Sequence, residues 1–160
     1  MSTCSGGRSA VGGTGMTLDE YTANFATWAV LASNLVLSVD LRSLPRGPCL
    51  DLLSNEEVLA VNQDPAGRAP RVLFQRGPAQ GFARPLADGS QAVLLLSRGE
   101  GRATLRVTWA ELGVAGPCRV RDLLARTDLG ALPSFQAALP KHAAALVKVV
   151  CAGSVAAQYV

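Results

Sequence analysis

The chain has 160 residues, which is the length of about one ordinary domain. Lysine and arginine number 15 and aspartate and glutamate number 12, and the resulting net charge of +3 is too small to argue for nucleic acid or an anionic membrane as a partner. Apolar residues make up 49%, which is enough for a buried core and excludes a wholly disordered chain. No apolar stretch approaches the ~20 residues that span a bilayer, and no apolar segment follows a basic start as in a secretory signal peptide.

Residues 17–32 have the pattern of an amphipathic helix. Thr17 and Glu20 have the spacing of a capping box, in which the threonine hydroxyl accepts from the backbone three residues on and the glutamate carboxylate accepts from the threonine N–H. Apolar residues then recur at helical spacing. We predict a helix over 18–32 with one wide apolar face, formed by Tyr21, Phe25, Trp28, Ala29 and Ala32.

Residues 35–39 form a short, continuous apolar run, which is typical of a parallel strand buried on both faces. A helix followed at once by such a strand is half of a βαβ unit. A further helix is predicted over 51–61, with a break near Ser54, where a second capping box restarts it. This helix should end before Pro65, because the residue that precedes a proline disfavours the α conformation.

From Arg71 onward the sequence consists of short β-type runs separated by turn residues, with no helical period. Strands at this spacing predict an antiparallel β-sandwich. Between residues 103 and 109 polar and apolar residues alternate, as expected for a strand with one wet and one dry face. The predicted strands are Val72–Gln75, Gly81–Pro85, Ala92–Ser97, Ala103–Trp109, Arg119–Leu123, Ser134–Leu139 and Ala143–Val150.

The α/β segment 17–64 holds only 48 residues and one predicted strand. If that strand were buried alone, each of its unsatisfied backbone groups would cost roughly 1–3 kcal/mol. The sequence therefore predicts that residues 35–39 are the last strand of a larger parallel sheet, whose earlier strands precede this chain.

Several motifs carry a family resemblance. In chain order they are Gly15-Met16-Thr17, Glu20-Tyr21, Phe25, Trp28-Ala29, Asp40-Leu41-Arg42 and the stretch from Asn55 to Pro65. On these residues the chain resembles the C-terminal part of glycoside hydrolase family 27, and in particular the α-galactosidases of plants and algae. The likeness covers about residues 11–150, and its specific part is the stretch 55–65.

The resemblance implies a fold that combines α/β and all-β parts: the end of a (β/α)₈ barrel followed by an antiparallel β-sandwich. In that fold residues 17–32 would be the seventh barrel helix, residues 35–39 the eighth strand and residues 51–61 the last helix. The implied organisation is an unrelated N-terminus (1–10), the barrel part (11–66), the sandwich (70–151) and a tail (152–160).

The resemblance also implies an activity. The family hydrolyses terminal α-D-galactosyl groups with retention of configuration and uses two aspartates, one as nucleophile and one as acid/base. Both aspartates lie on earlier barrel strands, upstream of this chain, so no catalytic, substrate-binding or metal-binding residue is assigned within it. A family aspartate that binds the sugar should fall just before Val11, where residues 4–8 hold no carboxylate. We therefore expect the chain alone to be inactive.

Other properties follow from the resemblance in the same way. It implies an α-galactoside as partner, no nucleic acid and no membrane, no metal or organic cofactor, and homodimers among full-length relatives. Those relatives are secreted, vacuolar or lysosomal. Two alternatives stay open: a non-catalytic carbohydrate-binding or structural sandwich module, and a non-functional truncated copy.

Five polar residues near the barrel end are candidates for a site. Asp40 and Arg42 close the predicted eighth strand, at the barrel face where active sites form. We favour an Asp–Arg pair that fixes the strand end over a contact with the sugar. Asn62, Gln63 and Asp64 are favoured as residues that cap the last helix and shape the domain junction.

His142 is the only histidine, and it has no serine or cysteine partner at a recognised spacing. We expect a surface or turn residue rather than a catalytic base. Trp28 is expected in the core, and core or interface packing is favoured over sugar stacking for Trp109.

Four cysteines stand at positions 4, 49, 118 and 151 and allow three disulfide connectivities. Their spacing does not suggest a zinc site. Two interpretations remain open: buried thiols, which are the commoner case, and a Cys118–Cys151 bridge, which requires an oxidising compartment.

Overall fold

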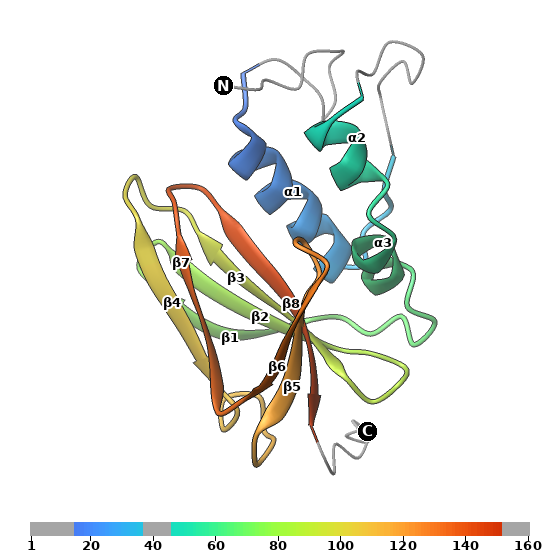
Figure 1. The fold of residues 1–160 in the computed structure, drawn as a ribbon, viewed down its shortest axis with the longest axis vertical. Helices are drawn as coiled ribbons and strands as arrows, with labels where there is room; N and C mark the ends of the chain where they lie inside the picture. Colours follow the sequence, from blue (N-terminus) through green and yellow to red (C-terminus); the bar gives the residue numbers. More distant parts are fainter. Residues whose placement is uncertain (1–14, 37–45, 152–160) are drawn as a thin grey trace.

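The structure is a computed structural model that describes residues 15–36 and 46–151. Helices come first in the chain, as α1 (Leu18–Val30), α2 (Pro48–Leu53) and α3 (Glu56–Asn62). Strands follow, as β1 (Arg71–Arg76), β2 (Ala79–Pro85), β3 (Gln91–Ser97), β4 (Ala103–Thr108), β5 (Cys118–Asp122), β6 (Thr127–Leu132), β7 (Ser134–Leu139) and β8 (Ala144–Cys151). Figure 1 shows the helices together beside the strands.

Helix α1 begins with the predicted capping box. The Thr17 hydroxyl accepts from the Glu20 N–H at 3.3 Å, and the Glu20 carboxylate accepts from the Thr17 N–H at 2.7 Å. The helix ends at Val30, two residues before the predicted end, and Ala32 already has a positive φ of 53°. The sequence pattern therefore identified this helix and its start correctly.

The predicted break near Ser54 is also confirmed, and it separates α2 from α3. The capping residue is Asn55, whose Oδ1 accepts from the N–H groups of Glu57 at 3.1 Å and Val58 at 3.3 Å. Ser54 instead donates its hydroxyl proton to the Leu50 carbonyl. Helix α2 begins at Pro48. A proline is well tolerated in the first turn of a helix, because the N–H that it lacks would have no acceptor within the helix at that position.

The strands form two antiparallel sheets, which confirms the predicted sandwich. The large sheet has the order β1-β2-β3-β8-β5-β6, and β4 pairs with β7 in a small sheet. All seven predicted strands are present, with ends within two residues of the prediction. Strand β6 was not predicted. It lies at the edge of the large sheet, and its residues are exposed or half-buried.

The two central strands of the large sheet, β3 and β8, are buried on both faces. Val93 and Val147 are paired across these strands and face the small sheet, where a core also includes Leu105, Val107 and Phe135. Their neighbours Leu94 and Leu146 face the other way and pack with the helices, in a core that includes Tyr21, Phe25 and Val58. The helices thus cover one face of the large sheet and β4–β7 the other (Figure 1).

The predicted parallel strand over 35–39 lies largely outside the described residues. Leu35 and Val36 are described and belong to neither a helix nor a strand. Within the described residues, no helix combines the length and the apolar character needed to cross a bilayer.

A disulfide joins Cys118 of β5 to Cys151 of β8, so the bridge interpretation of these two cysteines is the correct one. The two residues are paired directly across the neighbouring strands. Cys49 is disulfide-bonded as well.

We predict that replacing both Cys118 and Cys151 by alanine lowers the free energy of unfolding by about 3–4 kcal/mol. This is the free energy that the disulfide contributes by restricting the conformational entropy of the unfolded chain. The loop is long, since the cysteines are 33 residues apart. Urea denaturation of the wild type and the double variant without reductant measures the difference. An unchanged unfolding midpoint would contradict the prediction.

Candidate functional site

The polar side chains that link the helices to the sandwich form the most elaborate cluster in the described part of the chain. The central one is Arg84 of β2, whose side chain is 0% exposed. Its Nη1 donates to the carbonyl of Ala29 at 3.1 Å and to that of Val61 at 2.6 Å. These carbonyls lie in the last turns of α1 and α3, where the helix dipole favours a positive charge.

Burial of Arg84 has an electrostatic cost. Desolvation lowers the pKa of its guanidinium, and the nearby charge of Asp64 opposes that shift. The Nε and Nη2 atoms are buried without a hydrogen-bond partner. Arg84 therefore fixes the position of two helix ends through one of its terminal nitrogens.

Asn55 forms a second buried link. Besides capping α3 with its Oδ1, it donates from Nδ2 to the Leu123 carbonyl at 2.8 Å, and the residue is 2% exposed. Nearby, both terminal oxygens of Glu57 accept from Arg121, at 2.5 and 2.6 Å. This contact lowers the pKa of Glu57 and raises that of Arg121. The start of α3 is thus attached to β5 and the turn after it.

The end of α3 carries the polar residues that the sequence analysis assigned to the domain junction, and the structure places them there. Asn62 donates to the Ser33 carbonyl at 2.8 Å, which ties α3 to the segment after α1. The Asp64 carboxylate accepts from the Ala87 N–H at 3.0 and 3.1 Å, which ties it to the β2–β3 turn. Gln63 is exposed and is the C-cap residue of α3.

His142 lies in the turn between β7 and β8, as predicted, but it also reaches α1. Its Nδ1 is 2.8 Å from Glu20 Oε1, and its Nε2 is 3.1 Å from Glu100 Oε1. A neutral imidazole donates from one nitrogen only, so carboxylates on both sides favour the protonated ring. These contacts raise the pKa of His142. The pKa of Glu20 falls to about 2, chiefly because the Thr17 backbone donates to it.

The two tryptophans differ. Trp109 is 5% exposed and donates from Nε1 to the Leu132 carbonyl at 2.7 Å, which confirms the packing interpretation. The core assignment of Trp28 is wrong, since this side chain is 42% exposed. Helical spacing placed Trp28 on the same side of α1 as Tyr21 and Phe25. It could not show how wide the packed face is, and Trp28 lies at the edge of that face.

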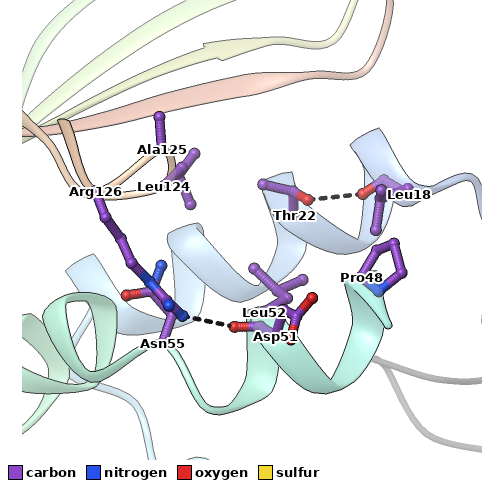
Figure 2. Close-up of a pocket in the computed structure, with 9 residues that line it drawn as sticks. All are labelled: Leu18, Thr22, Pro48, Asp51, Leu52, Asn55, Leu124, Ala125 and Arg126. Atoms are coloured by element: carbon purple, nitrogen blue, oxygen red, sulfur yellow. Dashed lines mark hydrogen bonds between the residues drawn. The ribbon is translucent and has the colours of Figure 1, made fainter. Parts of the chain in front are cut away.

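Clefts open on two sides of α1 within the described part of the chain. The first, about 380 Å³, lies between α1, α2 and the turn after β5 (Figure 2). Arg126 reaches across it and donates to the Asp51 carbonyl at 3.1 Å. Among the residues that line this cleft Asp51 is the single carboxylate, so the cleft has no pair of carboxylates for glycoside hydrolysis.

The second cleft, about 400 Å³, lies between α1 and the turns that join β3 to β4 and β7 to β8. His142, Glu20 and Trp28 are among its lining residues. The Glu20 carboxylate there is already engaged by Thr17 and His142, and its lowered pKa makes it unsuitable as a proton donor.

Five carboxylates of the described region behave as structural anions. A glycosidase acid needs a raised pKa. All the resolved carboxyl shifts in the described part of the chain are downward, and for Asp88 hydrogen bonds from Lys148 and Ser90 outweigh burial and lower the pKa to about 2. The others lie at Glu20, Glu57, Glu111 and Asp128.

Two remaining candidates, Asp40 and Arg42, lie outside the described residues. Among residues 15–36 and 46–151, no group of three or more His, Cys, Asp or Glu side chains is placed to hold a metal ion.

Comparison with known families agrees with both halves of this architecture. Residues 7–64 match the family described as alpha galactosidase A, and residues 76–149 match the alpha galactosidase C-terminal beta sandwich domain. The first match ends where the helices end, and the second covers most of the sandwich. The two matches therefore define the class of the chain as a segment of an α-galactosidase-family barrel followed by that family's β-sandwich.

Individual relatives point the same way. The chain is 36% identical to an alpha-galactosidase of Coffea arabica and 34% identical to one of Oryza sativa subsp. japonica, each over 82% of this chain. It spans 35% and 32% of their respective lengths. The chain belongs to glycoside hydrolase family 27, the α-galactosidase family.

Solved structures share the fold. Alpha-galactosidase I from Mortierella vinacea superposes with a TM-score of 0.80 at 30% identity, over 85% of this chain and 36% of that one. A β-L-arabinopyranosidase of the same family from Geobacillus stearothermophilus gives a TM-score of 0.81 at 30% identity, over 87% of this chain and 32% of that one.

We predict that Asn55→Ser keeps the cap of α3 but leaves the buried Leu123 carbonyl without its donor, which lowers the free energy of unfolding by about 1–3 kcal/mol. Asn55→Ala also removes the cap and should cost about 1 kcal/mol more. Urea denaturation of the three proteins measures both steps. A serine variant as stable as the wild type would show that the link to Leu123 contributes nothing.

We predict a pH-dependent contribution from His142. The pKa of His142 is raised in the folded protein, so its ion pairs stabilise the fold fully below pH 6.5. This contribution is lost as the pH rises through the pKa of His142 in the folded state. The lowered pKa of Glu20 means that its part is present above pH 4.5 and is lost as the pH falls towards 2. The difference in melting temperature between the wild type and the His142→Asn variant should therefore be largest between pH 4.5 and 6.5.

Asparagine suits this comparison because residue 142 has a positive φ of 56°, which asparagine tolerates. Glu100→Gln serves as a control that removes only the more exposed carboxylate. A difference in melting temperature that stays constant from pH 3 to 9 would refute the prediction.

Proposed function

We propose that this chain is the C-terminal part of a retaining α-galactosidase, in which it closes the barrel and attaches the sandwich to it. The observation that carries the proposal is the consecutive match of its two segments, 7–64 and 76–149, to α-galactosidase family models. The barrel part (11–66) and the sandwich (70–151) are then one continuous piece of that enzyme.

In this proposal the nucleophile and the acid/base lie in the upstream part of the enzyme. The carboxylates of the described region support this division, because their resolved pKa shifts are all downward and most bind backbone amides, guanidinium groups or His142. Retaining hydrolysis requires one carboxyl that stays protonated and one that attacks. The role of this chain is to support the barrel, and it needs no metal or organic cofactor for that role.

The substrate class is a terminal α-D-galactoside, taken from the relatives. The solved structures that resemble this chain to the same degree include both an α-galactosidase and a β-L-arabinopyranosidase. Two enzymes with different substrates thus share this region of the fold. We infer that the choice of sugar is made by residues upstream of this chain.

We predict that the purified 160-residue chain does not release nitrophenol from 4-nitrophenyl α-D-galactoside. A chimera in which the chain replaces the matching C-terminal part of the Coffea arabica relative should hydrolyse that substrate, because the upstream part of that relative supplies the catalytic groups. Circular dichroism must show a cooperative melt for both proteins.

Two results would overturn the proposal. One is turnover by the chain alone, and the other is a folded chimera without activity. An inactive chimera together with galactoside binding by the chain, measured by calorimetry, would support the carbohydrate-binding alternative instead.

A further inference from the structure

The small net charge of the whole chain hides an uneven distribution between its two parts. The sandwich, residues 70–151, contains 11 Lys or Arg and five Asp or Glu, which gives it a net charge of +6. The barrel part, residues 11–66, contains two Arg and seven Asp or Glu, which gives it a net charge of −5. A surplus of this size on one domain indicates an anionic partner more strongly than the +3 of the whole chain does.

Most cationic side chains of the sandwich already have a partner. Five of them pair with carboxylates, and three donate to backbone carbonyls. The remaining three, Arg98, Arg102 and Arg106, make no ion pair and no side-chain hydrogen bond among residues 15–36 and 46–151. Arg98 lines the cleft beside α1, whereas Arg106 belongs to β4 and Arg102 precedes that strand directly.

The two arginines at β4 lie on the side of the small sheet that faces away from the core. The odd-numbered residues of β4, 103–107, pack in the core of the sandwich, so the even-numbered ones point outward. The residues opposite them on β7 are likewise exposed. We call the following exposed residues the β4–β7 outer face: Arg102, Thr104, Arg106, Gln136 and Ala138.

No acidic side chain from these two strands neutralises the β4–β7 outer face. Residues 101–108 and 133–142, which include both strands and their ends, contain no Asp or Glu. Glu100 and Glu111 flank β4 on either side, and both already pair with cationic side chains other than the two arginines of this face. The charge of Arg102 and Arg106 is therefore available to a partner.

We propose that the β4–β7 outer face is a docking surface for an anionic polysaccharide, a chain that carries sulfate or carboxylate groups along its length. Guanidinium groups bind such groups through paired, charge-assisted hydrogen bonds. Arg102 and Arg106 are four residues apart along β-type backbone, which is roughly 13 Å. Side chains on one face of a strand project in parallel, so these two present separate sites. A polymer with repeated charges fits this arrangement better than a single small anion does.

Two observations favour a polysaccharide over other polyanions. The Cys118–Cys151 disulfide indicates an oxidising compartment, which differs from the reducing surroundings of most nucleic acids. The β4–β7 outer face also carries no aromatic and no large apolar side chain. It therefore lacks the stacking contacts that single-stranded nucleic acid uses and the side chains that insert into a membrane surface.

The position of the face keeps it open in the proposed enzyme. Strands β4 and β7 cover the side of the large sheet opposite to the helices (Figure 1). The upstream barrel would adjoin the helices, so we expect it to leave this face uncovered. The inference goes beyond the proposed function and does not require it, because docking needs only the sandwich and its charges.

The test measures binding of the 160-residue chain to dextran sulfate and to polygalacturonate by isothermal titration calorimetry at low ionic strength. The double variant Arg102→Gln/Arg106→Gln should weaken binding by about tenfold or more, because both charge-assisted contacts are lost. Whichever polymer the wild type binds more tightly identifies the anionic group, sulfate or carboxylate. Neutral dextran should not bind.

Arg98→Gln/Arg119→Gln is the matched control. It removes the same net charge, but Arg98 lines the cleft beside α1 and Arg119 lies on β5. Salt screens distant charges, so this control should weaken binding by less than about twofold. All four arginines are exposed, so the melting temperatures of both variants should match that of the wild type.

Several results would overturn the docking surface. Equal losses from the two double variants would attribute binding to net charge alone. Failure of the wild type to bind either charged polymer, or equal binding of neutral dextran, would reject the role of the arginines. Tighter binding of a DNA duplex than of both polymers would assign the face to nucleic acid. None of these measurements involves hydrolysis, so they are independent of whether the chimera is an active galactosidase.

Discussion

The fold depends on burial of β3 and β8 from both sides. Val93 and Val147 face the small sheet, while Leu94 and Leu146 face the helices, and all four are at most 1% exposed. A side chain of this size contributes about 1.5–3 kcal/mol when it is fully buried. Neither layer can be removed without exposing one row of these residues. The helices and the sandwich are therefore joined by a shared sheet and not only by a linker.

Polar contacts give this apolar arrangement its particular geometry. Arg84, Asn55 and Asp64 each connect a helix end to a strand or turn far along the chain. Hydrogen bonds of this kind contribute modestly when made, but leaving a buried partner unsatisfied is costly. They consequently select one orientation of the helices on the sheet. The apolar contacts alone would tolerate several orientations.

Much of this was visible in the sequence, because local signals and the final structure agree. The box at Thr17 and Glu20 marked the start of α1, and alternation marked β4. Strand β6 was not predicted because it is an edge strand in which Asp128 and Gly130 interrupt the apolar residues, and it is held by backbone pairing with β5. Gly130 within this strand has a positive φ of 76°. In a sequence a glycine at such a position is usually interpreted as part of a turn.

The candidate site was harder to predict, because its contacts join residues distant in sequence. His142 and Glu20 are 122 positions apart, and no sequence motif predicts that they are in contact. Trp28 shows a different limit of sequence analysis. Periodicity predicts on which side of a helix a residue lies, but whether that side is buried depends on the rest of the fold. The burial of Arg84 could not be predicted, since an arginine within a strand is usually exposed.

The two-sided burial of the central strands also restricts how such enzymes could have evolved. A gene segment encoding only residues 70–151 would give a product whose Leu94 and Leu146 meet water, which invites aggregation. Recombination between ancestral glycosidases could exchange this sandwich only together with the helices that shield it. The unit that must be kept together is therefore larger than the sandwich and includes the helices.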